Sequence, residues 1–207
     1  MSKHSLKLAE KIILALLLAL AAYIVFYKLG SFPLENWDEA WYGDIIRNML
    51  RQKDLIVLHW NRMPLIDKPP FFMWIGAALS SIIGLSEFSI RLPSALSALA
   101  AIAIVTIYSY RQYGFVPSLL AFSAIAFNNV FIWRARTGNI DALVSLQIFL
   151  TYFLILSKNK FRYLLLGILF AMIYLTKASL VFFPLVIFAL YELFLKFVIL
   201  RKTFLVT

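Results

Sequence analysis

Long apolar runs separated by short polar segments make up most of the chain. Several runs approach or exceed the roughly 17–25 apolar residues that an α-helix needs to cross a bilayer. Their polar and apolar positions do not alternate, as they do in the strands of a transmembrane barrel. The pattern therefore predicts an all-α, polytopic membrane protein in which residues 1–207 form a single membrane domain. About six spans are expected, at 12–29, 92–110, 115–133, 140–157, 161–176 and 178–200.

The longest polar interval, residues 36–74, follows the first of these spans. Within it, Trp41, Ile45 and Met49 recur at the spacing of one helix face, which predicts an amphipathic helix over 38–51 that lies along the membrane interface. Asn36 is the expected N-cap of this helix, and Glu39 completes a capping box.

Residues 71–85 are apolar, but the segment is short for a span and contains two glycines and two serines. We interpret it as an interfacial or re-entrant helix. Residues 30–91 then form one outer loop with two juxtamembrane helices. If this segment crossed the membrane instead, the chain would have seven spans.

The distribution of positive charge favours six spans, because cations gather on the cytoplasmic side of membrane proteins. With six spans, ten of the twenty Lys and Arg residues lie on that side: Lys3, Lys7, Lys11, Arg111, Lys158, Lys160, Arg162, Lys196, Arg201 and Lys202. With seven spans, seven lie there: Lys3, Lys7, Lys11, Arg91, Arg134, Arg136 and Lys177. The basic N-terminus is cytoplasmic in both arrangements, so the loop after the first span is extracytoplasmic.

Composition agrees with a membrane protein and excludes several functions. The chain is 63% hydrophobic with a mean hydropathy of +0.87, whereas soluble domains are about 45–50% apolar. The absence of cysteine excludes disulfides, thiolate nucleophiles and zinc–thiolate sites. We attribute the net charge of +10 to cations that flank the spans. Membrane lipids, and not nucleic acid, are therefore the expected partners.

In the six-span arrangement, several ionisable residues fall in the outer loop or at the outer ends of spans: Asp38, Asp67, Lys68, Arg91, Asp141 and Lys177. Ionisable groups at membrane depth are costly and often mark a site. Asp38 and Glu39 suit a general base, but acids in the first turn of a helix also complement its dipole. Asp141 has the same two interpretations at the start of its span.

The sequence Asp67-Lys68-Pro69-Pro70 fixes a cation and a carboxylate at the membrane surface, because a residue before proline is held extended. A boundary with a snorkelling lysine is the alternative interpretation. Four further cations suit either phosphate contacts or interface anchors: Arg91, Arg134, Arg136 and Lys177.

The two histidines, His4 and His59, do not form a metal cluster. His59 and Asp67 are the weak candidates for ligands of a divalent metal, whose presence the sequence leaves unknown.

Several motifs together resemble the membrane-embedded GT-C glycosyltransferases of the protein O-mannosyltransferase and aminoarabinose transferase type. They occur in the same order and spacing over roughly residues 12–185, and they read DEAWY from Asp38, DKPPFFMW from Asp67, SEFSIRLPSA from Ser86, the pattern Arg136-x4-Asp141-Ala-Leu, and Leu175-Thr176-Lys177. Asp67 stands where the aminoarabinose-type motif has Glu.

The resemblance implies transfer of a sugar from a polyprenyl-phosphate donor to an acceptor lipid, glycan or protein at the outer face of the plasma (inner) membrane. It makes Asp38, Glu39 and Asp141 the catalytic candidates. The implied contacts to the lipid phosphate and sugar are Tyr42, Asp67, Lys68, Arg91 and Lys177, although Arg91 could brace the loop instead. Inversion by a single displacement needs a base on the acceptor side and no covalent nucleophile on the protein.

Members of this family usually have eleven or more spans, so we expect the chain to be an N-terminal part, with a second chain or further sequence supplying the rest. Two other functions are open: a transporter or flippase of a lipid-linked sugar, and a non-catalytic subunit of a glycosylation complex. A transporter is expected to carry paired broken helices or an inverted repeat, and the sequence has neither.

Overall fold

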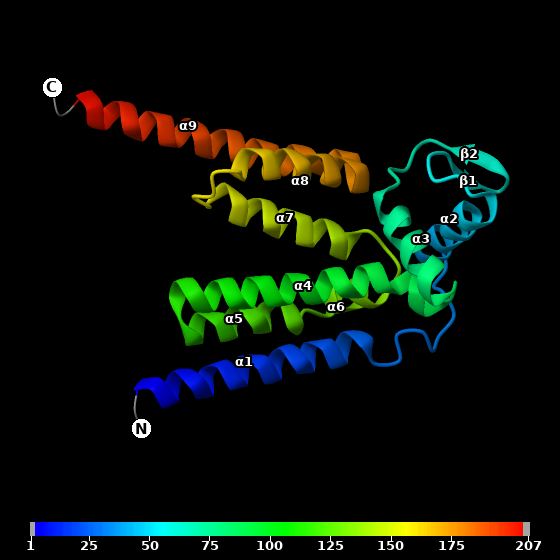
Figure 1. Ribbon diagram of the computed structural model, residues 1–207, viewed down its shortest axis with the longest axis horizontal. Coiled ribbons are helices and arrows are strands. Elements are labelled where there is room, and N and C mark those ends of the chain that lie inside the picture. Colours follow the sequence, from blue (N-terminus) through cyan, green and yellow to red (C-terminus); the bar gives the residue numbers. More distant parts are fainter. Residues whose placement is uncertain (1–2, 205–207) are drawn as a thin grey trace.

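The computed structural model describes residues 3–204, and the side chains of residues 7–195. It is a bundle of elongated helices with a smaller cap at one end (Figure 1). The bundle contains α1 (Lys3–Phe26), α4 (Glu87–Tyr113), α5 (Phe115–Ala126), α6 (Asn129–Arg136), α7 (Asp141–Ile155), α8 (Arg162–Lys177), the 3-10 turn η1 (Ala178–Val181) and α9 (Phe182–Phe204). The cap contains α2 (Asp38–Gln52), β1 (Leu58–Trp60), β2 (Met63–Leu65) and α3 (Phe71–Ile83). The predicted helical class is confirmed.

Helix α4 is central, and it packs against α1, α3, α5, α6 and α7. It begins at Glu87, five residues before the predicted span, because Ser86 and Ser89 form a capping box across its first turn. Small buried residues, Ala95 and Ala98, face Ala135 and Ala142 of neighbouring helices. Small side chains let helix backbones approach closely, which favours helix association in a membrane.

The predicted span 115–133 is two helices, α5 and α6, which meet at an angle of 61°. The Asn128 side chain accepts a hydrogen bond from the Phe131 backbone N–H at 2.9 Å and so starts a new helix. The segment is therefore bent rather than one straight helix, and its crossing of the membrane as a single span stays a prediction.

Helices α8 and α9 form a hairpin that turns at η1. Arg162 near the start of α8 pairs with Glu192 of α9 at 2.6 Å across this hairpin. The predicted last span began at 178, but residues 178–181 form the 3-10 turn and α9 begins at Phe182. This hairpin returns the chain toward the end of the bundle at which α1 begins (Figure 1).

By length and composition, three helical stretches suffice to cross a membrane: Lys7–Phe26, Glu87–Tyr113 and Arg162–Leu195, the last comprising α8, η1 and α9. The bent pair α5 and α6 supplies a fourth if it counts as one span. Helix α7 has 15 residues, fewer than the roughly 20 that a span requires. The predicted number of six spans is therefore not confirmed and stays a prediction.

The cap has its own apolar core, which joins α2, β1 and α3. Tyr42, Ile46 and Met49 of α2 are buried with Phe72 and Met73 of α3. Gly76 permits the close approach of the two helices, because an added Cβ would lie 2.4 Å from the Cδ1 of the fully buried Ile46. Helix α3 thus buries one face in the cap, and its place in the outer loop stays a prediction.

Two features of the cap differ from the sequence predictions. Helix α2 begins at Asp38 without a side-chain cap, and Glu39 accepts a hydrogen bond from the Glu35 backbone N–H at 2.6 Å, so the predicted capping box with Asn36 is wrong. The hairpin of β1 and β2 was not predicted. Its two-residue turn, Asn61 and Arg62, has φ of 50° and 65°, the left-handed values of a type I′ turn.

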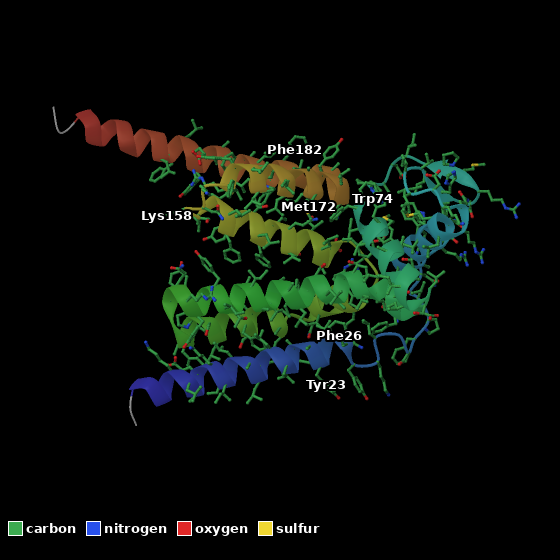
Figure 2. All side chains as sticks on the ribbon, viewed as in Figure 1. Tyr23, Phe26, Trp74, Lys158, Met172 and Phe182 are labelled. Atoms are coloured by element: carbon green, nitrogen blue, oxygen red, sulfur yellow. The ribbon has the colours of Figure 1, made fainter. Side chains whose placement is uncertain are left out.

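The structure predicts which loops share one side of the membrane. Lys158, between α7 and α8, lies at the opposite end of the molecule from Trp74 of the cap (Figure 2). The chain has no cysteine, so single cysteines can be labelled without background. Asn159→Cys and Tyr113→Cys should react with an impermeant maleimide only from the cytoplasmic face, and Ile66→Cys only from the opposite face. Labelling of Tyr113→Cys and Ile66→Cys from the same face would contradict this arrangement.

Candidate functional site

A buried ion pair joins the cap to the bundle. The Arg91 Nε donates to Glu39 Oε1 at 2.7 Å and its Nη2 donates to Oε2 at 2.9 Å. Both residues are almost fully buried, with 4% and 3% of their surface exposed. The two parallel hydrogen bonds are the strong bidentate form of an arginine–carboxylate contact.

The remaining N–H groups of Arg91 hold the chain that follows α1. Its Nη1 donates to the carbonyls of Leu29 and Phe32, at 2.8 and 2.9 Å, and its Nη2 donates to Pro33 at 2.8 Å. All five N–H groups of the guanidinium therefore have protein acceptors. Arg91 thus braces the loop in this structure, as in the alternative interpretation of its sequence motif.

Glu39 is the acceptor at the centre of the same contact. Its carboxylate also accepts hydrogen bonds at 2.6 Å from the backbone N–H groups of Glu35 and Gly138. Burial alone would raise the Glu39 pKa, but the bonds from Arg91 and from these two N–H groups hold it below its ordinary value. Glu39 therefore stays ionised, and both of its carboxylate oxygens already accept hydrogen bonds. This suits a positioning role better than proton transfer.

Gly138 must lack a side chain for this contact to form. An added Cβ would lie 2.9 Å from Ile90 Cγ2 and 3.2 Å from the Ile90 carbonyl oxygen, which belongs to the backbone of α4. The loop between α6 and α7 is therefore held against both α4 and Glu39.

A second arginine holds the end of α1. Arg136 of α6 donates to the carbonyls of Ile24, Val25 and Tyr27, the last at 2.7 Å. These carbonyls lie at the C-terminus of α1, where helical partners are missing. Arg136 thus caps α1 and is not placed as a contact to a ligand in the cavities described next.

A polar cavity of about 290 Å³ lies where the cap meets α8. Its wall includes four of the residues predicted to bind substrate: Tyr42, Asp67, Lys68 and Lys177. Thr176, Ala178 and Ser179 complete the side formed by the end of α8 and by η1. Two lysines on one small cavity provide positive charge for an anionic group.

A larger, mainly aromatic cavity of about 660 Å³ adjoins it, and Asp67 lines both. The other walls of this aromatic cavity include Asp38, Trp37, Trp41 and Trp60. Lys68 lies over the Trp41 ring, with its Nζ 4.7 Å from the ring centroid. This cation–π contact stands between the polar and aromatic cavities.

Asp141 connects Lys177 of the polar cavity to the start of α7. Its carboxylate lies 3.3 Å from Arg134 Nε and 3.6 Å from Lys177 Nζ. Asn139 accepts a hydrogen bond from the Asp141 backbone N–H at 3.0 Å and thereby supports the first turn of α7. Asp141 therefore positions Lys177. It also lies in the first turn of α7, where an acid complements the helix dipole.

The pKa of the Tyr42 phenol is affected by three of the four predicted carboxylates. Burial, followed by the negative charges of Asp38, Asp141 and Asp67, raises its pKa to about 12, although Arg134 acts in the opposite direction. Tyr42 is therefore a hydrogen-bond donor at neutral pH. Tyr42 and Asp67 line the same polar cavity.

The described residues do not build a metal centre by themselves. Within residues 3–204, no group of three or more His, Asp or Glu side chains lies close enough to hold a metal ion. His59 lies in β1, where its carbonyl accepts a hydrogen bond from Asn48 at 3.1 Å. Asp67 faces the two cavities, so the two metal candidates do not join a shared cluster.

Sequence reasoning missed the tryptophans of the aromatic cavity and the role of Gly138. Trp37 is the residue before α2 with φ 71°, and it is 90% exposed. A tryptophan directly before the acidic pair Asp38 and Glu39 is a sequence signal that could have found this cavity. The position of Trp60 depends on the unpredicted hairpin.

Comparisons with known proteins point to one family. Residues 67–206 match the family described as dolichyl-phosphate-mannose-protein mannosyltransferase. An uncharacterized protein of Aquifex aeolicus is 27% identical over 81% of this chain and 34% of its own length. An undecaprenyl phosphate-α-4-amino-4-deoxy-L-arabinose arabinosyl transferase of Aeromonas salmonicida is 26% identical over 75% of this chain and 30% of its own. The chain thus spans about a third of the length of these relatives.

Solved structures share the fold. The crystal structure of ArnT from Cupriavidus metallidurans in the apo state matches with a TM-score of 0.73 at 22% identity, over 82% of this chain and 33% of that one. The structure of the same protein bound to undecaprenyl phosphate matches with a TM-score of 0.71, over 79% and 32%.

Removing one member of the Arg91–Glu39 pair should destabilise the protein strongly. Glu39→Gln leaves a buried guanidinium without its counter-charge, at an expected cost of about 3–5 kcal/mol. Asp44→Asn breaks the exposed Asp44–Arg47 pair on the same helix and should cost about 1 kcal/mol or less. Thermal unfolding in nanodiscs compares the two variants. Equal melting temperatures would show that the buried pair is dispensable.

Stability should also depend on pH through Glu39. Its pKa is lowered on folding, so its contribution is complete above the ordinary value of 4.5 and declines as pH falls through the lower folded value. The difference in melting temperature between the native protein and Glu39→Gln should therefore be constant above about pH 5 and shrink in stronger acid. A difference that changes between neutral pH and pH 5 would contradict the lowered pKa.

Proposed function

Since the chain belongs to the dolichyl-phosphate-mannose-protein mannosyltransferase family and has the GT-C fold of the aminoarabinose transferase type, we propose that it forms the donor site of a glycosyltransferase. The reaction is transfer of a sugar from a polyprenyl-phosphate carrier to an acceptor hydroxyl or phosphate. The observation that carries the proposal is the pair of adjoining cavities that share Asp67, one with two lysines and the other with Asp38.

The polar cavity is the proposed place of the carrier phosphate. Attack on the anomeric carbon breaks the bond to the phosphate oxygen, so negative charge develops on the departing lipid phosphate. Lys68 and Lys177 line this cavity and stabilise that charge electrostatically. Tyr42, protonated at neutral pH because its pKa is about 12, donates a hydrogen bond to the phosphate or to the sugar.

The aromatic cavity is the proposed place of the acceptor. Asp38 is exposed on its wall and accepts the proton of the attacking hydroxyl as a general base. The new bond forms between the acceptor oxygen and the anomeric carbon, and the proton goes to the Asp38 carboxylate. An acceptor on the opposite side of the sugar from the phosphate gives inversion in a single displacement.

Asp141, Glu39 and Arg91 act as positioning residues in this proposal. Asp141 holds the Lys177 ammonium at 3.6 Å and Arg134 at 3.3 Å. Glu39 and Arg91 fix the start of α2, and therefore Asp38, against the loop that leads into Asp141. A positioning residue affects the geometry of the site without touching the reacting atoms.

The membrane orientation is part of the same proposal. The molecule is a multi-pass membrane protein, and we place the N-terminus of α1 in the cytoplasm and the cap outside the plasma (inner) membrane. The carrier lipid then enters laterally from the bilayer at the level of the cap. The acceptor is a lipid, a glycan or a protein on the same side.

Asp38→Asn should abolish sugar transfer. The amide cannot accept the proton, and loss of a general base lowers turnover by about 10²–10⁴-fold. Asp44→Asn is the matched control, because Asp44 lies on the same helix and lines neither of the two cavities. The measurement is transfer of radiolabelled sugar from a polyprenyl-phosphate donor in membranes that contain the protein.

Both variants must insert at the level of the native protein, which immunoblotting of the membranes verifies. Full turnover by Asp38→Asn in such a preparation would remove Asp38 from the base role. A loss of turnover in Asp44→Asn as large as in Asp38→Asn would assign the effect to the cap as a whole.

A further inference from the structure

A third cavity, of about 400 Å³, lies on the flank of the bundle. It is formed by the segment after α1 and by α6, and its polar wall includes Lys28, Glu35, Asn129 and Arg136. It shares no lining residue with the polar or the aromatic cavity. We refer to it as the flank pocket.

The flank pocket carries unused positive charge. Among the described residues, Lys28 has no carboxylate within ion-pair distance, and its Nζ lies 5.4 Å from the centroid of the Tyr27 ring. Arg136 donates three hydrogen bonds to carbonyls at and just after the end of α1. Two of its five N–H groups therefore remain for another acceptor.

The other charges at the flank pocket do not cancel this excess. Arg91 contributes to the wall, but Glu39 neutralises it. Glu35 is the acid that lines the pocket, and its carboxylate accepts a hydrogen bond from Trp133 Nε1 at 3.1 Å. Lys28 and Arg136 together outweigh Glu35 by one positive charge.

Aromatic side chains place the pocket at the membrane surface. Phe32 and Trp133 line the pocket and are exposed, and Tyr23 in the last turns of α1 and Tyr27 directly after it are also exposed. Figure 2 shows Tyr23 on the side of α1 that faces away from the bundle, whereas Phe26 packs toward the interior. Tyrosine and tryptophan gather at the depth of the lipid headgroups. Helix α1 is little buried over its apolar length, so lipid reaches this flank.

We propose that the flank pocket binds the phosphate of an anionic phospholipid headgroup. Lys28 supplies a mobile ammonium, and the free N–H groups of Arg136 supply a planar donor set of the kind that recognises phosphate. Tyr23, Tyr27 and Phe32 accommodate the first part of the acyl chains. The bound lipid then stabilises residues 24–33, whose carbonyls Arg91 and Arg136 also hold.

The test is retention of phosphatidylglycerol by the full chain, counted by native mass spectrometry after release from nanodiscs. Lys28→Gln should lower retention about fivefold, the effect of removing one cation at a membrane surface. Lys53→Gln is the matched control, since Lys53 is also exposed and also has a left-handed φ, 55° against 53° for Lys28. Retention of phosphatidylcholine should be the same in all three proteins.

One further comparison decides what kind of ligand the flank pocket takes. Inorganic phosphate at equal concentration should not displace the lipid, because it lacks the acyl chains that the aromatic side chains hold. The proposal is overturned if Lys28→Gln retains phosphatidylglycerol as the native protein does, if Lys53→Gln loses it equally, or if inorganic phosphate displaces it.

Discussion

A guanidinium buried at the end of a helix bundle needs an acceptor for each N–H, and Arg91 finds five of them in two segments of the chain. Two are the oxygens of Glu39, and three are the carbonyls of Leu29, Phe32 and Pro33. Glu39 in turn accepts from the Gly138 backbone N–H. One ion pair thus fixes the exit from α1, the start of α2 and the entry to α7. Asp38 and Asp141 lie next to these fixed points, so the shape of both cavities depends on this contact.

The apolar pattern predicted the class of fold because a membrane constrains helix length and composition so strongly. The pattern also located α3 and the helix over 38–51 well, because each of these helices has one apolar face. It did not show the break at Asn128, although asparagine is a preferred N-cap and Asn128-Asn129 inside an apolar run could have marked the start of a new helix. The hairpin at Asn61 and Arg62 also escaped prediction, since its strands are three residues each and their positions depend on packing against α2.

The residues of the predicted site divided according to how their side chains are used. Tyr42, Asp67, Lys68 and Lys177 meet at one cavity, although 135 positions separate the first from the last. Motif order could suggest that grouping, because helix ends on one side of a membrane lie close together. The sequence alone could not separate Asp38 from Glu39. They are adjacent, yet one faces a cavity and the other is buried against Arg91, and this difference depends on helix rotation within the cap.

The central claim is that the carrier phosphate and the acceptor occupy adjoining cavities on either side of Asp67. The most direct measurement is a structure determined with a polyprenyl-phosphate sugar bound to the protein in nanodiscs. The account predicts the phosphate within hydrogen-bond reach of the Lys68 and Lys177 ammonium groups, with the anomeric carbon turned toward Asp38. A phosphate bound in the aromatic cavity, or on the flank beside Lys28, with the polar cavity free of donor, would contradict it.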